Sequence, residues 1–331
     1  MRPITPVAAR PPGHRCMWPH SAICVPQISS GRGLLRDPRS PGAAAGCQRV
    51  RRPADPPLRG HRGSAGPAKR VVTIRPYASM DRMSAVPGNR VLPAEPPRVN
   101  DYDTLAEGYT ASNETSLFNA YYERPAMLAL AGDVAGRRIL DAGCGSGPLF
   151  AALRDRGAIV TGFDSSAGML AQARRRLGYD ASLQVADLGR PLPYAHGAFD
   201  DVIASLVLHY LEDWGPALAE LRRVLKPGGR LIASVDHPFA IVGLQRQEGR
   251  KVDYFATYNW TEEWTIGGET VPMSFWNRPL HAMTDAFTAA GFRISVISEP
   301  DPVPEARDLF PDLLAEKPSF LCFLFFVLHA E

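Results

Sequence analysis

Short apolar runs alternate with amphipathic segments from about residue 135 to the end of the chain. Each run has the length of a strand buried in a sheet, and apolar residues at helical spacing follow it. We expect the first five strands at 139–142, 158–163, 182–186, 201–207 and 230–235. Strands that alternate with helices in this way predict a mostly parallel sheet with helices on both faces.

Two of the expected helices have clear boundary signals. A serine pair at 165–166 can cap a helix over 167–177, and the glycine that follows it is placed to end it. The next helix is expected to include Leu225 and to end at Pro227-Gly-Gly.

The C-terminal region predicts a helix from about Pro279 to Ala290 and a strand at 292–298. The run Phe320-Leu-Cys-Phe-Leu-Phe-Phe-Val-Leu328 is the only strongly hydrophobic segment of the sequence. Its length is well short of the ~20 residues that a membrane-spanning helix needs, so we interpret it as a buried final strand.

Two regions lie outside this alternation. The segments 102–109 and 118–124 predict helices that could close over a ligand site, and residues 237–277 bring eight aromatic side chains into an otherwise polar stretch. Two interpretations of this insert remain open: it packs on its own domain, or its rings form the wall of a substrate pocket. For the second, the candidate substrate contacts are Tyr109, Tyr122, Tyr258, Trp260 and Trp264.

A strand leads through a carboxylate into a glycine-rich turn at Arg138-Ile-Leu-Asp-Ala-Gly-Cys-Gly-Ser-Gly147. Gly143, Gly145 and Gly147 lack side chains, so backbone N–H groups can approach a ligand and the next helix can pack closely. Asp141 lies two residues before the first glycine, where it would repel a pyrophosphate and attract an ammonium group. The turn therefore predicts a nucleotide-type cofactor that carries a positive charge at this point.

Polar residues also stand at the ends of the other expected strands. Asp164 ends the second strand, 21 residues after Gly143, which is the spacing of a carboxylate that binds a ribose. Asp187 follows the third strand and His209 the fourth. Because ligands of doubly wound sheets bind at the carboxyl ends of strands, we expect these side chains to surround one site.

Five motifs occur in order within roughly residues 100–330: Leu140-Asp-Ala-Gly-Cys-Gly-Ser-Gly147, Gly162-Phe-Asp-Ser165, Ala186-Asp187, Phe199-Asp-Asp-Val202 and Leu221-Arg-Arg-Val-Leu-Lys-Pro-Gly-Gly229. Together they resemble the class I S-adenosylmethionine-dependent methyltransferases, in particular the small-molecule group that includes the ubiquinone and menaquinone biosynthesis enzymes. The resemblance implies a doubly wound, Rossmann-like α/β fold with a mostly parallel seven-stranded sheet. In that family the final strand is antiparallel and lies between the fifth and sixth.

The resemblance also implies the cofactor S-adenosyl-L-methionine and a role for each residue near it. Asp141 would support the ammonium of the methionine portion, and Asp164 would accept hydrogen bonds from the ribose hydroxyls. Ser165 and Met169 would border the adenine, whose exocyclic amine Asp187 would accept. The remaining implied contacts are Gly143, Gly145 and Ser205 at the methionine and the Leu188 backbone near the adenine, with Gly147 serving helix packing.

Such an enzyme would methylate a small organic acceptor, and the sequence leaves the acceptor atom, O, N or C, open. A sulfonium is already an activated leaving group, so in-line alignment of acceptor, methyl and sulfur can achieve much of the catalysis. A base matters for a hydroxyl or carbon acid and less for a neutral amine. His209 after the fourth strand and His237 after the fifth are the candidate catalytic residues, although a hydrogen-bonded structural histidine fits either position equally well.

Residues 1–98 have a different composition, with 17 Lys and Arg against four Asp and Glu, and 17 of the 31 prolines. This composition predicts a disordered basic extension ahead of a methyltransferase domain at 99–331. We favour a solvated extension, or upstream translation ahead of a true start near Met80 or Met83. A targeting peptide and a nucleic-acid-binding tail are the alternatives.

The five cysteines show no paired spacing, which indicates a reducing compartment. We therefore expect a cytoplasmic protein, and we expect no membrane span, metal site or nucleic-acid partner. The oligomeric state stays open.

Two rival functions keep part of the same pattern. A dinucleotide-dependent oxidoreductase would share Asp164, but Asp141 behind the glycine turn disfavours a pyrophosphate. A non-catalytic S-adenosylmethionine-binding partner of another enzyme would keep every motif, and only turnover distinguishes it. Ser205-Leu-Val-Leu208 stands where nucleic-acid and protein amide methyltransferases often have an Asn-Pro-Pro-Tyr-like tetrapeptide, which favours a small-molecule acceptor.

Overall fold

The fold is given by a computed structural model that describes residues 98–314 and 319–331. The expected basic extension, apart from its last residue, and the expected start near Met80 or Met83 lie outside the described residues. None of the described helices is long and apolar enough to cross a membrane.

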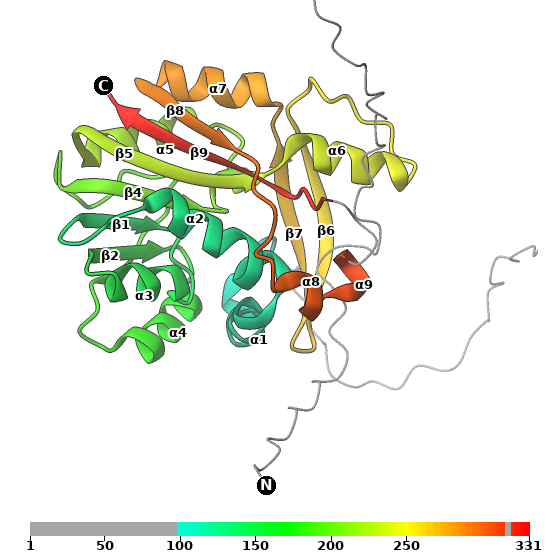
Figure 1. Ribbon diagram of the computed structural model, residues 1–331, viewed down its shortest axis with the longest axis horizontal. Coiled ribbons are helices and arrows are strands. Elements are labelled where there is room, and N and C mark those ends of the chain that lie inside the picture. The colour runs from blue at the N-terminus through cyan, green and yellow to red at the C-terminus, as the bar shows by residue number, and fades with distance from the viewer. Residues whose placement is uncertain (1–97, 315–318) are drawn as a thin grey trace, which may run out of the picture. The chain divides into compact units, whose positions relative to one another are not determined.

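Seven strands form one sheet in the order β3-β2-β1-β4-β5-β9-β8 (Figure 1). The first five strands are parallel to one another, and β9 is antiparallel to both of its neighbours. This arrangement confirms the doubly wound fold with an antiparallel final strand. The strands are β1 (Arg138–Ala142), β2 (Ile159–Asp164), β3 (Leu183–Val185), β4 (Phe199–Ser205), β5 (Leu225–Asp236), β8 (Phe292–Ser298) and β9 (Phe323–Ala330).

Helices cover both faces of this sheet (Figure 1). Val202 and Ile203 of β4 point to opposite faces and are fully buried, so each face contributes to its own hydrophobic core. This two-sided burial explains why the strands are continuous apolar runs in the sequence. One core includes α2 (Arg124–Ala131), α3 (Pro148–Asp155) and α4 (Ala167–Leu177), and the other includes α5 (Gly215–Val224) and α7 (Leu280–Ala289).

Two local expectations are wrong. Helix α5 ends at Val224, and Leu225 begins β5, where it pairs with Phe199 of β4. The connection 186–198 between β3 and β4 contains no helix. Its two prolines, at positions 191 and 193, lack the N–H groups that a helix interior needs.

The aromatic-rich insert folds into a helix followed by a hairpin. α6 (Pro238–Gln247) begins directly after β5, and β6 (Tyr258–Ile266) pairs antiparallel with β7 (Glu269–Asn277). Gly267 and Gly268 have φ angles of 64° and 91°, which suit a two-residue hairpin turn. The hairpin forms a sheet of its own and packs against α1 (Tyr102–Thr115) (Figure 1). The shorter described helices are η1 (Asn119–Glu123), η2 (Leu208–Tyr210), α8 (Ala306–Leu309) and α9 (Pro311–Leu314).

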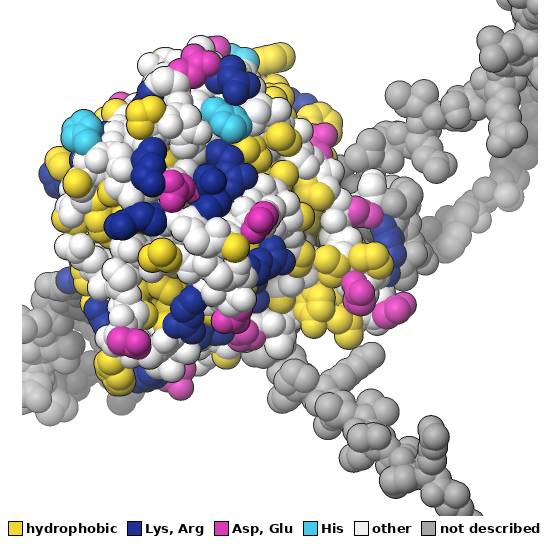
Figure 2. Space-filling view, turned by 60° about the vertical axis from the view of Figure 1, so that its left-hand side comes forward, with side chains coloured by type: hydrophobic (Ala, Val, Ile, Leu, Met, Phe, Trp, Pro, Cys, Tyr) yellow, Lys and Arg dark blue, Asp and Glu magenta, His cyan; other side chains and the backbone are white. Residues whose placement is uncertain are grey.

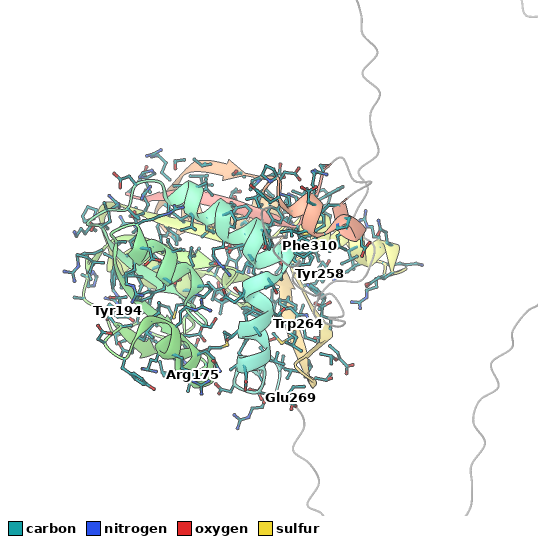
Figure 3. The ribbon with its side chains drawn as sticks, turned by 60° about the horizontal axis from the view of Figure 1, so that its bottom comes forward. Arg175, Tyr194, Tyr258, Trp264, Glu269 and Phe310 are labelled. Atoms are coloured by element: carbon teal, nitrogen blue, oxygen red, sulfur yellow. The ribbon has the colours of Figure 1, made fainter. Side chains whose placement is uncertain are left out.

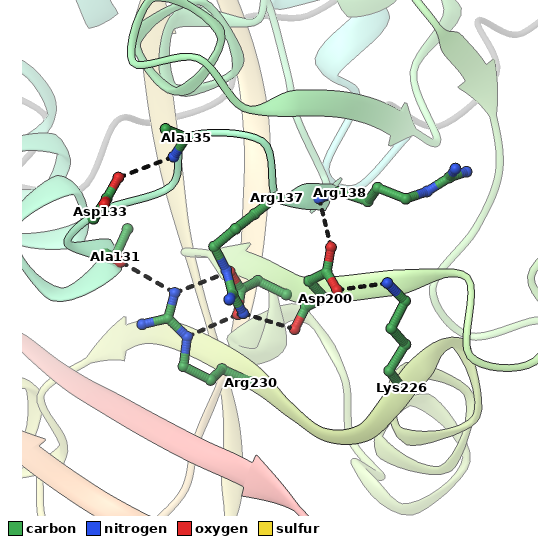
Figure 4. Close-up of polar contacts among 9 residues, drawn as sticks. Ala131, Asp133, Ala135, Arg137, Arg138, Asp200, Lys226 and Arg230 are labelled. Carbon is green, nitrogen blue, oxygen red and sulfur yellow. Dashed lines mark hydrogen bonds and ion pairs between the residues drawn. The ribbon is translucent and has the colours of Figure 1, made fainter.

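The buried carboxylate of Asp201 in β4 joins the residue before β1 to β5 through two arginines, Arg137 and Arg230, which Figure 4 labels. Arg137 donates to Asp201 at 2.5 and 2.7 Å, and Arg230 donates to the same carboxylate at 2.7 and 2.9 Å. Burial works against the charge of Asp201, yet the hydrogen bonds from the two arginines outweigh it and hold its pKa below the usual value. The Arg230 Nη2, which donates to Asp201, also donates to the Ala131 carbonyl at 3.1 Å and so ties the network to the end of α2.

We expect Asp201→Ala to lower the free energy of unfolding by roughly 2–4 kcal/mol, because it leaves two half-buried guanidinium groups without their partner. Urea unfolding followed by circular dichroism measures this change. Asp133→Ala is the matched control, since Asp133 is exposed and only caps its own turn through Ala135. Equal stability losses in the two variants would contradict the interpretation.

The surface at the end from which the parallel strands enter the sheet has mixed charge. Figure 2 shows Lys and Arg side chains on this side interspersed with Asp, Glu and apolar groups. A mixed surface of this kind differs from the continuous basic stripe that marks a nucleic-acid-binding face.

Candidate active site

A cavity of about 370 Å³ opens at the carboxyl ends of β1, β2, β4 and β5. This is where the strand order reverses, the usual position of a ligand site in a doubly wound sheet. Residues of α1, η1 and the β6–β7 hairpin line its other sides. The structure brings all nine of the expected cofactor residues to this cavity: Asp141, Gly143, Gly145, Asp164, Ser165, Met169, Asp187, Leu188 and Ser205.

The glycine turn packs closely against the protein, and its first three N–H groups are bonded within the protein. Gly143 has a φ of 75°, and a Cβ atom there would meet the Val207 side chain at 2.9 Å. The N–H groups of Gly143 and Cys144 donate to the Phe163 carbonyl, both at 2.9 Å, and that of Gly145 donates to Asp164. The expected approach of these N–H groups to a ligand is therefore not observed. A turn whose donors are already bonded is a poor anion site.

Asp141 is a buried carboxylate with one oxygen left unpaired. The group is 1% exposed, and the Phe150 backbone in the first turn of α3 donates to it. Its Oδ2 atom has no hydrogen-bond partner. Burial, together with the nearby Glu123 and Asp164 carboxylates, raises the pKa of Asp141 to about 7. A buried carboxylate oxygen without a partner is unfavourable, and a positively charged hydrogen-bond donor would stabilise it most.

Asp164 is held rigidly at the end of β2. Its Oδ2 accepts from the Gly145 N–H at 2.8 Å and its Oδ1 from the Ser166 N–H at 2.9 Å. Burial raises the pKa of Asp164, and these backbone hydrogen bonds counteract part of that rise. The Ser165 backbone also donates to this carboxylate, and the acceptor capacity that remains is available to ligand hydroxyl groups. Ser166, rather than Ser165, caps α4 by accepting from the Met169 N–H at 3.0 Å.

A third buried carboxylate, Glu123, was not among the residues expected from the sequence. Its Oε1 accepts from the Ser205 hydroxyl at 2.6 Å and from the Ser234 hydroxyl at 2.7 Å. Burial raises its pKa, and the group is close enough to Asp141 to raise the pKa of that residue as well. Glu123 ends the π-helical segment η1, a local irregularity often found at functional sites.

Arg124 supplies a positive charge to the cavity wall. Among the described residues that line the cavity it is the one Lys or Arg, and its Nη2 donates to the Asn113 carbonyl at 3.0 Å and to the Asn113 side chain at 2.5 Å. The sequence placed it only within an expected helix at 118–124. Its position allows it to pair with a ligand carboxylate.

Aromatic side chains line the cavity from α1, η2 and the hairpin. Trp264 projects from β6 toward α1 (Figure 3), where its ring stacks on Tyr109 with centroids 6.3 Å apart and planes at 5°. The Tyr102 and Tyr210 hydroxyls lie 2.5 Å apart. We call the Tyr, Trp and Phe rings that line the cavity from α1, η2 and the hairpin the aromatic wall: Tyr102, Tyr109, Tyr210, Trp260, Trp264 and Phe275.

Two of the expected substrate residues lie away from the cavity. Tyr122 is buried against Phe323, with ring centroids 5.3 Å apart. The Tyr258 hydroxyl donates to Gln245 of α6 at 2.7 Å. Each interpretation of the insert holds for some of its rings: some pack within the domain, and others line the cavity.

The two candidate catalytic histidines occupy different environments. His209 lines the cavity and contacts Asp236, which ends β5 and was not expected from the sequence. His237 does not line the cavity: its Nδ1 accepts from the Phe239 N–H at 3.2 Å, and its Nε2 lies 2.6 Å from Glu299. His237 thus caps α6 and joins it to the end of β8.

Comparison with known proteins agrees with this geometry. The family model for a methyltransferase domain matches residues 140–233, from β1 to β5. A demethylmenaquinone methyltransferase of Clavibacter sepedonicus is 38% identical over 133 residues, which cover 40% of this chain and 54% of that protein. A malonyl-[acyl-carrier protein] O-methyltransferase of Enterobacter lignolyticus is 44% identical over 94 residues, covering 28% of this chain and 37% of that protein. The chain thus spans about half of the first relative's length and less of the second.

A solved structure extends the likeness beyond the matched span. The S-adenosylmethionine dependent methyltransferase from Mesorhizobium loti is similar with a TM-score of 0.50 and 28% identity, covering 66% of this chain and 99% of that one.

Proposed function

Because this chain carries a methyltransferase domain of the class I, S-adenosylmethionine-dependent kind, we propose that it transfers a methyl group from S-adenosyl-L-methionine to a small organic acceptor. The observation that carries the proposal is the unpaired, buried Oδ2 of Asp141 at the carboxyl end of β1. An ammonium group satisfies it, and Asp164 on the neighbouring strand is positioned for the hydroxyl groups of a ribose.

The residues of the cavity fit this cofactor. Asp141, with Glu123 beside it, would hold the ammonium, and Arg124 would pair with the carboxylate of the methionine portion. Asp164 would accept from the ribose. The remaining contacts are Gly143, Gly145 and Ser205 at the methionine and Ser165, Met169, Asp187 and Leu188 at the adenine. When bound, the cofactor supplies a methyl group on a sulfonium, which is an activated leaving group.

The chain's own contribution is then mainly alignment and exclusion of water. Rings of α1, η2 and the hairpin line the side of the cavity that the assigned cofactor contacts do not use. An acceptor held against them loses translational and rotational freedom before reaction, which is the main source of rate in a transfer of this type. The burial of Trp260, Trp264 and Phe275 limits the access of water.

Turnover tests the proposal against a non-catalytic role in cofactor binding. The full-length protein is incubated with S-adenosyl-L-methionine that carries a labelled methyl group and with metabolite extracts, to which demethylated quinols are added because of the relative named above. We expect label in an acceptor fraction, and about 10- to 100-fold less of it with Asp141→Asn at a cofactor concentration below the dissociation constant of the parent protein. Tight cofactor binding without label in any fraction would support the non-catalytic alternative.

The aromatic wall gives a separate prediction for the acceptor. Trp264→Ala should lower kcat/KM for the acceptor about tenfold or more, while the dissociation constant of the cofactor changes less than about twofold. Trp276→Ala is the matched control, because the alternation of β7 turns that ring away from the buried face. If Trp264→Ala lowers thermal stability and leaves the kinetics unchanged, the wall is only a packing cluster.

A further inference from the structure

A carboxyl and an imidazole meet at the edge of the aromatic wall. Asp236 ends β5 and His209 follows β4, the strand beside it. The His209 Nδ1 lies 3.2 Å from the Asp236 Oδ2 and accepts from the Asp236 N–H at 3.4 Å. Both residues line the cavity. The Asp236 side chain is only 12% exposed and the His209 side chain 7%. The pair is therefore a polar group enclosed by protein and open to whatever occupies the cavity.

The backbone that carries His209 is held in an unusual conformation. Leu206 has a φ of 49°, in the left-handed region that residues other than glycine rarely adopt. Its N–H donates to the Ser234 carbonyl at 3.1 Å and to the Ser234 hydroxyl at 3.0 Å, which fixes the turn to β5. Local strain that the surrounding structure enforces is typical of functional sites. Here it orients the segment that brings His209 to Asp236.

The surroundings of the pair contain rings and no described cation. The centroid of the His209 ring lies 4.7 Å from that of the Tyr210 ring and 5.4 Å from that of the Phe275 ring, and both contacts are edge-to-face. Burial alone raises the pKa of Asp236, so no neighbouring Lys or Arg of the described residues counteracts it. An anionic acceptor would find no partner here, whereas a flat, uncharged ring would find aromatic contacts on several sides.

We propose that Asp236, whose backbone N–H donates to the Nδ1 of His209, receives the proton of an aromatic hydroxyl group, so that the acceptor is a phenol-type ring methylated on its oxygen. This inference rests on the proposed function. A neutral amine can attack a methyl group with its lone pair and needs little help from a base, whereas a hydroxyl group must lose its proton. An enclosed carboxyl beside the acceptor space therefore favours a hydroxyl acceptor.

The step balances within the groups named. The hydroxyl oxygen forms a bond to the methyl carbon while the bond from that carbon to sulfur breaks, and its electron pair stays on the sulfur. The hydroxyl proton passes to the Asp236 carboxylate, which becomes a neutral acid. The positive charge of the sulfonium and the negative charge of Asp236 thus disappear together, and the proton leaves to water after product release.

The protonation states of the pair suit this role near neutral pH. Burial raises the pKa of Asp236 to about 7 and lowers that of His209 to about 3, so the imidazole stays neutral and the carboxyl titrates. Within residues 98–314 and 319–331, the other titratable groups that interact with Asp236 are Tyr210 of η2 and Glu262 of β6. Burial also raises the pKa of Glu262 to about 7, so a test must separate the two carboxyl groups.

The test uses the full-length protein, saturating S-adenosyl-L-methionine and a panel of phenols, catechols, amines and carboxylic acids. We expect methyl transfer to a hydroxyl oxygen, with kcat/KM for the acceptor rising about tenfold per pH unit up to a midpoint near 7. Saturating cofactor keeps Asp141 ionised through the bound ammonium, so this carboxyl does not add to the profile. Transfer to amines, carboxylates or ring carbons only would overturn the inference and leave the proposed function standing. Label on no acceptor would count against the proposed function itself.

Variants assign the base. Asp236→Asn should lower kcat/KM for weakly acidic phenols about 10²- to 10⁴-fold and remove the rise with pH. It should keep most of its activity toward a phenol that is already ionised at the assay pH, such as 4-nitrophenol, because no base is then needed. Glu262→Gln should retain both the rise with pH and the activity. If Asp236→Asn loses activity equally toward ionised and neutral phenols, or if Glu262→Gln removes the rise, Asp236 is not the base.

His209 is a positioning residue in this scheme, since it acts through Asp236. His209→Asn should lower kcat about tenfold and preserve the rise of kcat/KM with pH. Loss of that rise in the His209 variant, with the rise intact in Asp236→Asn, would assign the base to the imidazole and overturn the inference.

Discussion

Asp141→Asn is expected to weaken S-adenosyl-L-methionine binding by about 10- to 100-fold and to stabilise the ligand-free protein at the same time. The first effect follows from the loss of a charged acceptor for the ammonium, which typically contributes about 1–3 kcal/mol. The second follows from the burial of Asp141, whose unpaired Oδ2 carries a negative charge in the free protein above neutral pH. Calorimetry and thermal unfolding measure the two effects separately.

The pH dependence of both effects has a definite sign. The pKa of Asp141 is about 7 in the folded protein, above the value of about 3.9 for an unfolded aspartate. The folded state therefore binds the proton more tightly, and Asp141 costs the native state stability progressively as pH rises from about 4 to 7. Above pH 7 this cost is complete, so the stabilisation by Asp141→Asn should be largest there and should vanish near pH 4.

Cofactor affinity should show the opposite trend in the parent protein. Below pH 7 the ammonium must displace a proton from Asp141. The dissociation constant of the cofactor should therefore rise by up to about tenfold for each unit by which the pH falls. Asp141→Asn should show no such dependence. A variant that binds normally, or a parent protein whose affinity is flat between pH 5 and 8, would contradict the ammonium assignment.

The sheet and the strand-end residues that line the cavity could be predicted from the sequence because both depend on local pattern. The apolar runs placed β1 to β4 within two residues at each end, since strands buried on both faces must be continuously apolar, whereas β5 begins five residues earlier than expected. The polar residues that follow those strands then lie together because parallel strands end at one edge. For Asp141 and Asp164, strand ends were enough to predict a shared site.

The acceptor side was harder to predict because it depends on which way a side chain points. In β5, Ile232 and Ser234 share the face toward α2 and η1, so the alternation of the strand places Asp236 on that face too. His237 comes one position later, caps α6 and turns toward Glu299. Its imidazole made His237 the candidate, whereas the period of the strand favoured the aspartate before it.

Other parts of the site had weaker signals. Glu123 lies in a π-helical segment, whose extra residue per turn shifts the facing of side chains in a way that helical periodicity does not anticipate. The Gly267-Gly268 turn and the alternation around Trp260 and Trp264 indicate a hairpin in the sequence. The prediction for the insert rested on its aromatic content alone and did not include this hairpin.

Asp164→Ala is expected to have the second large effect, because one carboxylate serves both the fold and the ligand. The substitution leaves the N–H groups of Gly145 and Ser166 without acceptors, which should lower the free energy of unfolding by roughly 2 kcal/mol. It also removes the acceptor for the ribose hydroxyls, so cofactor affinity should fall by roughly 10- to 100-fold. Calorimetry at a temperature where the variant remains folded measures the second effect directly.

A ligand comparison separates the ribose contact from general damage to the turn. The parent protein should bind S-adenosylhomocysteine more tightly than its 2′-deoxy and 3′-deoxy analogues, and Asp164→Ala should bind all three with nearly equal affinity. Asp187→Ala is the matched control. The Asp187 side chain accepts from the Gly189 N–H at 2.8 Å and borders the cavity just after β3. Its loss should weaken the binding of all three ligands alike and leave the preference for the ribose hydroxyls intact. If Asp164→Ala retains the preference for the ribose hydroxyls, their partner is another residue, and Asp164 serves only to hold Gly145 and Ser166 in place.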